Sequence, residues 1–138
     1  MYRKIVVAFD GSDGAQAALR KAVALAEASG GTLHLVESTG HLEYATQGVI
    51  EGAAGAESSA RRTLEDAADL LDETHAVTRV INGDPVRGII GAAEDVDADL
   101  IVMGSRGRAM MPQAVLGRVS SGVVNNSPCD VLVVHPLP

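Results

Sequence analysis

The segment from residue 103 to residue 124, MGSRGRAMMPQAVLGRVSSGVV, carries residue types that can bind an anion. Glycines occupy positions 104, 107, 117 and 122, and arginines occupy positions 106, 108 and 118. No acidic residue lies between Leu100 and Cys129, although the chain has a formal net charge of −7. Glycine lets a backbone turn sharply and approach a ligand closely, and arginine pairs well with phosphate. The segment indicates either a phosphate-binding turn or a glycine turn with solvated arginines at the start of a helix.

Alternating strands and helices must position this segment. Continuous apolar runs predict buried strands, and apolar residues at helical spacing predict helices. The predicted strands are 4–9, 32–38, 76–81, 98–104 and 130–136, and the predicted helices are 12–29, 48–74, 85–96 and 112–126. This order is typical of an α/β protein with a doubly wound, open, five-stranded parallel sheet and helices on both faces, a Rossmann-like fold. With neither a repeat nor a low-complexity linker, the 138 residues predict a single domain, 1–138.

Ligands of such sheets bind beyond the carboxyl ends of the strands, where the strand order reverses. Three glycine-containing segments follow predicted strands there: DGSDG, NGDP and GSRG. A helix beginning near Pro112 would direct its free N–H groups and its positive dipole end toward an anion. The P-loop pattern and the dinucleotide-binding G-x-G-x-x-G pattern are both missing from the sequence.

Composition excludes several classes of protein. No apolar run approaches the roughly 20 residues needed to span a membrane, and the start of the chain, MYRKIVVAFDG, has no signal-peptide pattern. The excess of acidic over basic residues, 18 against 11, argues against a nucleic-acid partner. That excess reflects either selection for high salt or GC-rich codon usage. The single cysteine, Cys129, suits a reducing compartment, so we expect a cytoplasmic protein.

The glycine spacing and several longer stretches resemble the universal stress protein family. Two residues separate Gly104 from Gly107, and nine separate Gly107 from Gly117, which matches the family's G-x2-G-x9-G pattern. The stretches KIVVAFDGSDGAQAAL, LHLVES, ADLIVMGSRG and LGRVSSGVVNNSPCDVLVVHP extend the similarity over essentially the whole length. The resemblance implies a fold of the adenine nucleotide alpha hydrolase type, commonly a dimer, in a family where some members bind ATP and others do not.

The resemblance also implies an adenine-nucleotide site with ATP as cofactor and Mg²⁺ as an accompanying ion. Asp10 would meet the ribose or the phosphates, directly or through Mg²⁺, unless it only caps the helix that follows. Leu35 would line the adenine pocket, with Met103 nearby. Backbone amides of the glycine loop would hold the phosphates. The remaining residues of this predicted site are Gly104, Arg106, Gly107, Gly117, Arg118, Val119 and Ser120.

One position departs from the family pattern. ATP-binding members have Ser or Thr after the last glycine, whereas this chain has Arg118. Arg118 either supplies a charged phosphate partner, projects into solvent or blocks the pocket, and Ser120 and Ser121 are alternative hydroxyl donors. His34 and Cys129 are interpreted as packed residues rather than as catalysts.

These observations favour an ATP-binding stress-response protein that acts as a regulatory dimer on protein partners the sequence does not identify. The alternatives are an interaction module that does not bind nucleotide and a weak ATPase. No placed nucleophile or base is evident in the sequence, so we expect at most slow hydrolysis of ATP. The last predicted strand, 130–136, is apolar on both faces. At a sheet edge, this apolar strand would have to be covered by another chain to avoid aggregation, so we expect a homodimer through this strand.

Overall fold

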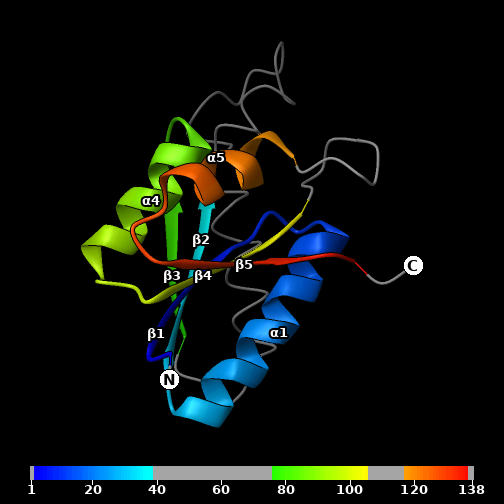
Figure 1. Ribbon diagram of the computed structural model, residues 1–138, viewed down its shortest axis with the longest axis vertical. Helices are drawn as coiled ribbons and strands as arrows, with labels where there is room; N and C mark the ends of the chain where they lie inside the picture. The colour runs from blue at the N-terminus through cyan, green and yellow to red at the C-terminus, as the bar shows by residue number, and fades with distance from the viewer. Residues whose placement is uncertain (1, 39–75, 106–116, 137–138) are drawn as a thin grey trace.

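Five parallel strands form the sheet in the described part of the chain (Figure 1). The computed structural model describes residues 2–38, 76–105 and 117–136. The strand order is β3-β2-β1-β4-β5. The strands are β1 (Lys4–Ala8), β2 (Thr32–Ser38), β3 (Ala76–Ile81), β4 (Leu100–Gly104) and β5 (Asp130–Val134). The order reverses between β1 and β4, and this makes the carboxyl edge of these two strands the switch point of the sheet.

Helices cover both faces of the sheet. Helix α1 (Asp13–Ser29) packs on one face, and α4 (Pro85–Asp95) and α5 (Arg118–Asn126) pack on the other (Figure 1). Each face therefore has its own apolar core. Helix α1 ends at Gly30, whose φ of 71° is a left-handed conformation that glycine adopts without strain. Among the helices of the described ranges, none is both long enough and apolar enough to cross a membrane.

The predicted α/β fold with a doubly wound parallel sheet is confirmed. The predicted spans of β2 and β3 match the observed ones, and the predicted strands 4–9, 98–104 and 130–136 each prove one or two residues too long at one end. The expected helix over 48–74 lies outside the described residues.

The prediction for the start of the last helix was wrong. Helix α5 begins at Arg118 rather than near Pro112, because Gly117 is its N-cap with an extended backbone, φ −65° and ψ 164°. The Gly117 N–H donates to the carbonyl of Ser105 at 2.8 Å, which ties the start of α5 to the end of β4. The positive end of the α5 dipole therefore lies next to the β4 exit.

Candidate functional site

The carboxyl ends of β1 and β4 are neighbours in the sheet, since Val7 of β1 pairs with Val102 of β4. Helix α1 starts immediately above them. A Cβ built at Gly104 would lie 2.9 Å from the carbonyl carbon of Gly14 and 3.1 Å from its oxygen. Gly104 thus lets the first turn of α1 pack directly against the end of β4. This close contact is a structural reason for glycine at position 104, in addition to the ligand contact expected from the sequence.

The helices α1, α4 and α5 all begin at this edge, and their caps differ. The Ser12 hydroxyl caps α1 by accepting from Ala15 N at 3.1 Å, and the Asp84 carboxylate caps α4 by accepting from Arg87 N at 3.0 Å. At α5 the N-cap is Gly117, and no side-chain cap bond is made. Side-chain oxygens therefore already occupy the first turns of α1 and α4, whereas the N-cap of α5 offers its first-turn amides no side-chain acceptor.

A small set of hydrogen bonds joins the start of α5 to β4 and β5. The Ser105 carbonyl accepts from Gly117 N at 2.8 Å and from the Ser120 hydroxyl at 2.8 Å, and Ser105 N donates to the Val134 carbonyl at 3.0 Å. The Ser120 hydroxyl also lies 3.1 Å from the Gly117 carbonyl. Ser120 is 2% exposed. Its hydroxyl therefore holds the start of α5 in place, which is a structural role in addition to the phosphate-donor role considered from the sequence.

Two buried polar residues at this edge escaped the sequence analysis. Ser105 is 1% exposed, and its Oγ finds no hydrogen-bond partner within the part of the chain that the structure describes. Glu37 is also 1% exposed and lies near the carboxyl end of β2. Their sequence signal was a polar residue at the end of an apolar strand, in GSRG and LVES. Both polar groups face the interior where the strands of the sheet end.

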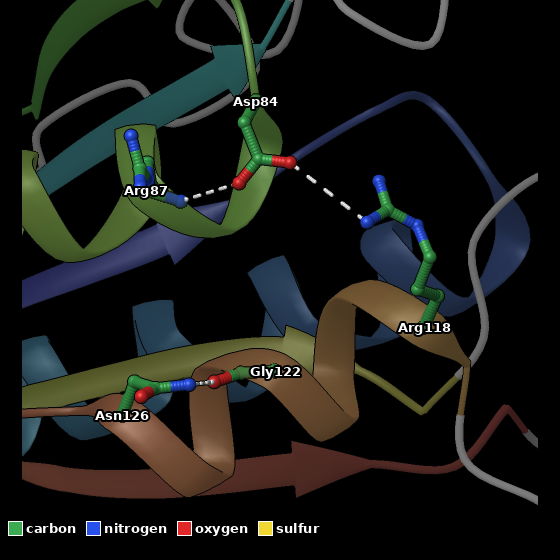
Figure 2. A network of polar contacts seen from close by, with 5 residues as sticks. All are labelled: Asp84, Arg87, Arg118, Gly122 and Asn126. Carbon is green, nitrogen blue, oxygen red and sulfur yellow. Dashed lines mark hydrogen bonds and ion pairs between the residues drawn. The ribbon is translucent and has the colours of Figure 1, made fainter.

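Arg118 points from the first turn of α5 toward Asp84 at the start of α4 (Figure 2). The Nη1 atom of Arg118 lies 3.8 Å from Oδ1 of Asp84, and the two side chains are 72% and 42% exposed. Arg118 is therefore not buried in the core, and its largely exposed side chain lies within ion-pair distance of Asp84. Its guanidinium spans the space between the two helix starts.

The structure does not bring Leu35 and Met103 together, although both are almost fully buried. Leu35 pairs with Val7, and Val7 pairs with Val102, so these three side chains share the α1 face of the sheet. Met103 follows Val102 and points to the opposite face, where it packs in the α4 and α5 core. The expectation that Met103 lies near Leu35 is corrected by this alternation.

Asp10 lies just beyond β1 and is not the cap of α1. Its Oδ1 accepts from Ser12 N at 2.9 Å, and Ser12 is the residue that caps the helix. Within the described ranges no group of three or more His, Cys, Asp or Glu side chains converges on one point. A magnesium ion here would thus be held as Mg²⁺ usually is beside nucleotides, by a single carboxylate and the phosphates rather than by a protein cage.

The remaining predicted site residues are partly visible. Gly117 is buried at the start of α5, and Val119 is half-buried in its first turn. Arg106 and Gly107 lie outside the described residues. The structure therefore places Asp10, Gly104, Gly117, Arg118, Val119 and Ser120 along one edge of the sheet.

Two other residues singled out in the sequence have environments that suit packing. Burial, together with the positive charge of Lys4, lowers the pKa of His34 below its ordinary 6.5. Burial also raises the pKa of Cys129, although a hydrogen bond with Ser127 opposes this effect. A thiol with a raised pKa is a poor nucleophile near neutral pH.

An open groove of about 400 Å³ runs between α4 and α5. It is lined by both charged and aliphatic side chains: Asp84, Val86, Arg87, Ile90, Glu94 and Asn126. None of the predicted site residues lines this groove. We place the site instead at the carboxyl ends of β1 and β4, where the predicted residues gather.

Comparisons with known proteins agree with this fold. The universal stress protein family profile matches residues 1–135. The Thermus aquaticus "universal stress protein in QAH/OAS sulfhydrylase 3'region" is 36% identical over 142 residues, which cover 98% of this chain and 100% of that relative. A universal stress protein solved in complex with cAMP is 30% identical with a TM-score of 0.71, and the match covers 99% of this chain and 98% of that one. The universal stress protein from Archaeoglobus fulgidus solved in complex with dAMP is 25% identical with a TM-score of 0.73, over 96% and 98% of the two chains.

Proposed function

Since this chain belongs to the universal stress protein family, we propose that it binds an adenine nucleotide, with ATP as the cofactor, at the carboxyl ends of β1 and β4. The observation that carries the proposal is the reversal of strand order between these two strands, which is where nucleotides bind in open α/β sheets. Two family members of the same fold were solved in complex with adenine nucleotides, cAMP and dAMP. Both ligands combine an adenine base with a single phosphate.

The phosphates are proposed to lie at the start of α5. The first-turn amides of this helix have no side-chain cap, and the positive end of its dipole favours an anion. Gly117 and Val119 contribute backbone amides, and Arg118 contributes charged donors. Arg106 and Gly107 are proposed to complete the loop on sequence grounds alone.

The ribose and the base are proposed to lie above β1 and β2. Asp10 leaves the end of β1 and would contact the ribose or a phosphate-bound Mg²⁺. Leu35 remains the proposed adenine contact from β2. Met103 would border the site only from the opposite face of the sheet, because it packs beneath α4 and α5.

We further propose that the protein is a cytoplasmic regulatory homodimer that pairs through β5. Strand β5 lies at the edge of the sheet, as the sequence predicted, and Val131, Leu132 and Val133 are only half-buried in the single chain. A second copy of the strand across a two-fold axis would cover both apolar edges at once. Nucleotide binding near the end of β4 would then be one strand away from the subunit interface.

An interaction module without nucleotide is the second candidate function. It is favoured by Arg118, which stands where ATP-binding members have Ser or Thr and which pairs with Asp84 in the structure. In this case the Arg118 side chain would close the phosphate site rather than serve it.

Mass spectrometry of small molecules released from the purified, denatured protein separates the two functions. We expect an adenine nucleotide at near one equivalent, or its binding in a calorimetric titration with ATP. Gly107→Val should weaken ATP binding at least tenfold, about 1.4 kcal/mol. Gly91→Val is the matched control, because nothing lies within 4 Å of a Cβ at that position in α4. No released nucleotide and no heat of binding would refute the proposal in favour of the interaction module.

A further inference from the structure

We propose that Asp84 is a built-in competitor for the nucleotide phosphate, because its carboxylate forms a 3.8 Å ion pair with Arg118 and a bound phosphate must draw Arg118 away from it. The inference rests on the proposed nucleotide site and assigns Asp84 to that site as a specificity-determining residue in addition to Arg118. Asp84 follows β3 in the sequence, outside the loop that carries the glycine motif.

The position of the ion pair supports this role. Helix α4 packs over β2 and β1, and α5 packs over β5, the strand beside β4. Because β1 and β4 lie between β2 and β5, a contact from the start of α4 to the start of α5 passes over the exits of β1 and β4. Arg118 and Asp84 make this contact (Figure 2). The pair therefore spans the place proposed for the phosphates.

The two partners differ in how firmly they are held. Oδ2 of Asp84 accepts the cap bond from Arg87 N at 3.0 Å, so this carboxylate is fixed by the start of α4. Arg118 has a long stem and is 72% exposed. Its 3.8 Å separation from Asp84 exceeds the distance of a charge-assisted hydrogen bond, whereas Arg79 and Asp95 at the other end of α4 approach to 2.8 Å. Arg118 can therefore move to a ligand while Asp84 stays in place.

The charge of the ligand decides the competition. A phosphate monoester carries nearly two negative charges at neutral pH and offers paired oxygens to a guanidinium. It can displace the single charge of Asp84, while a cyclic phosphodiester carries one charge and competes less well. The site is thus built to prefer nucleotides that end in a phosphate monoester over cyclic nucleotides.

Asp84→Ser tests the competition without removing the helix cap, because serine also caps helices. In calorimetric titrations we expect Asp84→Ser to bind AMP about three- to fivefold more tightly than the wild type, the range that an exposed ion pair can supply. Adenosine, which has no phosphate, should bind unchanged. Asp95→Ser removes the same charge from the far end of α4, where it pairs with Arg79, and it should leave AMP binding unchanged.

The double variant shows whether Asp84 acts through Arg118. Arg118→Ala should weaken AMP but not adenosine, and adding Asp84→Ser to it should give less than a twofold gain. Arg118→Ala should weaken the binding of cyclic AMP by a smaller factor than the binding of AMP. An equal loss would overturn the proposed preference for phosphate monoesters.

Two results separate this inference from the function on which it rests. If adenosine and AMP bind the wild type but Asp84→Ser leaves AMP affinity unchanged or weakens it, Asp84 is not a competitor and the nucleotide site stands. If neither adenosine nor AMP binds the wild type, the nucleotide site is refuted, and the competition is refuted with it.

Discussion

Replacing Gly104 with alanine tests the packing that brings α1 onto the end of β4. The added Cβ would lie 2.9, 3.1 and 3.2 Å from the carbonyl carbon, oxygen and Cα of Gly14. These are backbone atoms of the first turn of α1, so they cannot rotate away as a side chain would. Either α1 or β4 must shift by a few tenths of an ångström. Overpacking of this kind costs about 1–3 kcal/mol.

Gly91→Ala in the middle of α4 is the matched control. Nothing lies within 4 Å of a Cβ at this position, so alanine should stabilise the protein by about 0.5–1 kcal/mol through reduced backbone entropy. Gly104→Ala receives a similar entropic gain, which leaves a net loss of about 0–2.5 kcal/mol. The difference in unfolding free energy between the two variants therefore isolates the packing term, about 1–3 kcal/mol.

Urea unfolding followed by far-ultraviolet circular dichroism is the suitable assay, because the chain has no tryptophan for fluorescence. We expect the denaturation midpoint of Gly104→Ala to fall below that of the wild type and the midpoint of Gly91→Ala to rise above it, with equal slopes. Equal midpoints for the two alanine variants would refute the argument that Gly14 requires a glycine at position 104.

Three further predictions follow from other parts of the structure. Burial and the Lys4 charge lower the pKa of His34 below 6.5. The contribution of neutral His34 to the unfolding free energy is therefore present above pH 6.5 and is lost as the pH falls through the lowered pKa. His34→Gln should flatten this pH dependence of the unfolding free energy. Ser105→Ala removes a buried hydroxyl that has no partner among the described residues, so it should raise stability by about 1 kcal/mol, and a lower midpoint in urea would contradict this. Val133→Pro should disrupt pairing through β5 and yield monomers or aggregates in light scattering, while a monomeric wild type at micromolar concentration would refute the dimer.

The sequence predicted the sheet well because its strands are locally encoded. Apolar runs bounded by glycine and polar residues marked β2 and β3 with the bounds that the structure shows, and the helices between strands implied the parallel order. The sequence left open whether Asp10 only caps the helix that follows it. The structure selects Ser12 through its bond to Ala15 N, which sequence spacing alone does not distinguish.

The start of α5 was missed because a long-range bond sets it. Gly117 N donates to the carbonyl of Ser105, and the segment between them has the composition of either a loop or a helix. Leu35 and Met103 were placed together for a related reason. The face of the sheet on which each side chain lies depends on the register of β2, β1 and β4, in which Leu35 pairs with Val7 and Val7 pairs with Val102.

The contact between Asp84 and Arg118 was also beyond the sequence, since it depends on how α4 and α5 pack against the same face. The sequence showed that Arg118 replaces a hydroxyl residue of the family pattern, and it left three roles open for the side chain. The structure shows that Arg118 does not fill the core, since its side chain is 72% exposed and its guanidinium lies 3.8 Å from Asp84. Its guanidinium lies beside the proposed phosphate site, opposite a carboxylate that a phosphate can replace as its partner.

The overall charge of the protein explains why such a local arrangement matters. A net charge of −7 repels an anionic nucleotide at long range, so attraction must come from groups close to the phosphate. The segment from Ile101 to Pro128 contributes no acidic residue to that site. Asp84 is the acidic side chain that α4 adds to it, and Arg118 offsets its charge. When a phosphate replaces Asp84 as the partner of Arg118, the Asp84 carboxylate stays beside the ligand. The affinity for phosphate therefore reflects the repulsion from the fixed carboxylate of Asp84 and the attraction to the mobile guanidinium of Arg118.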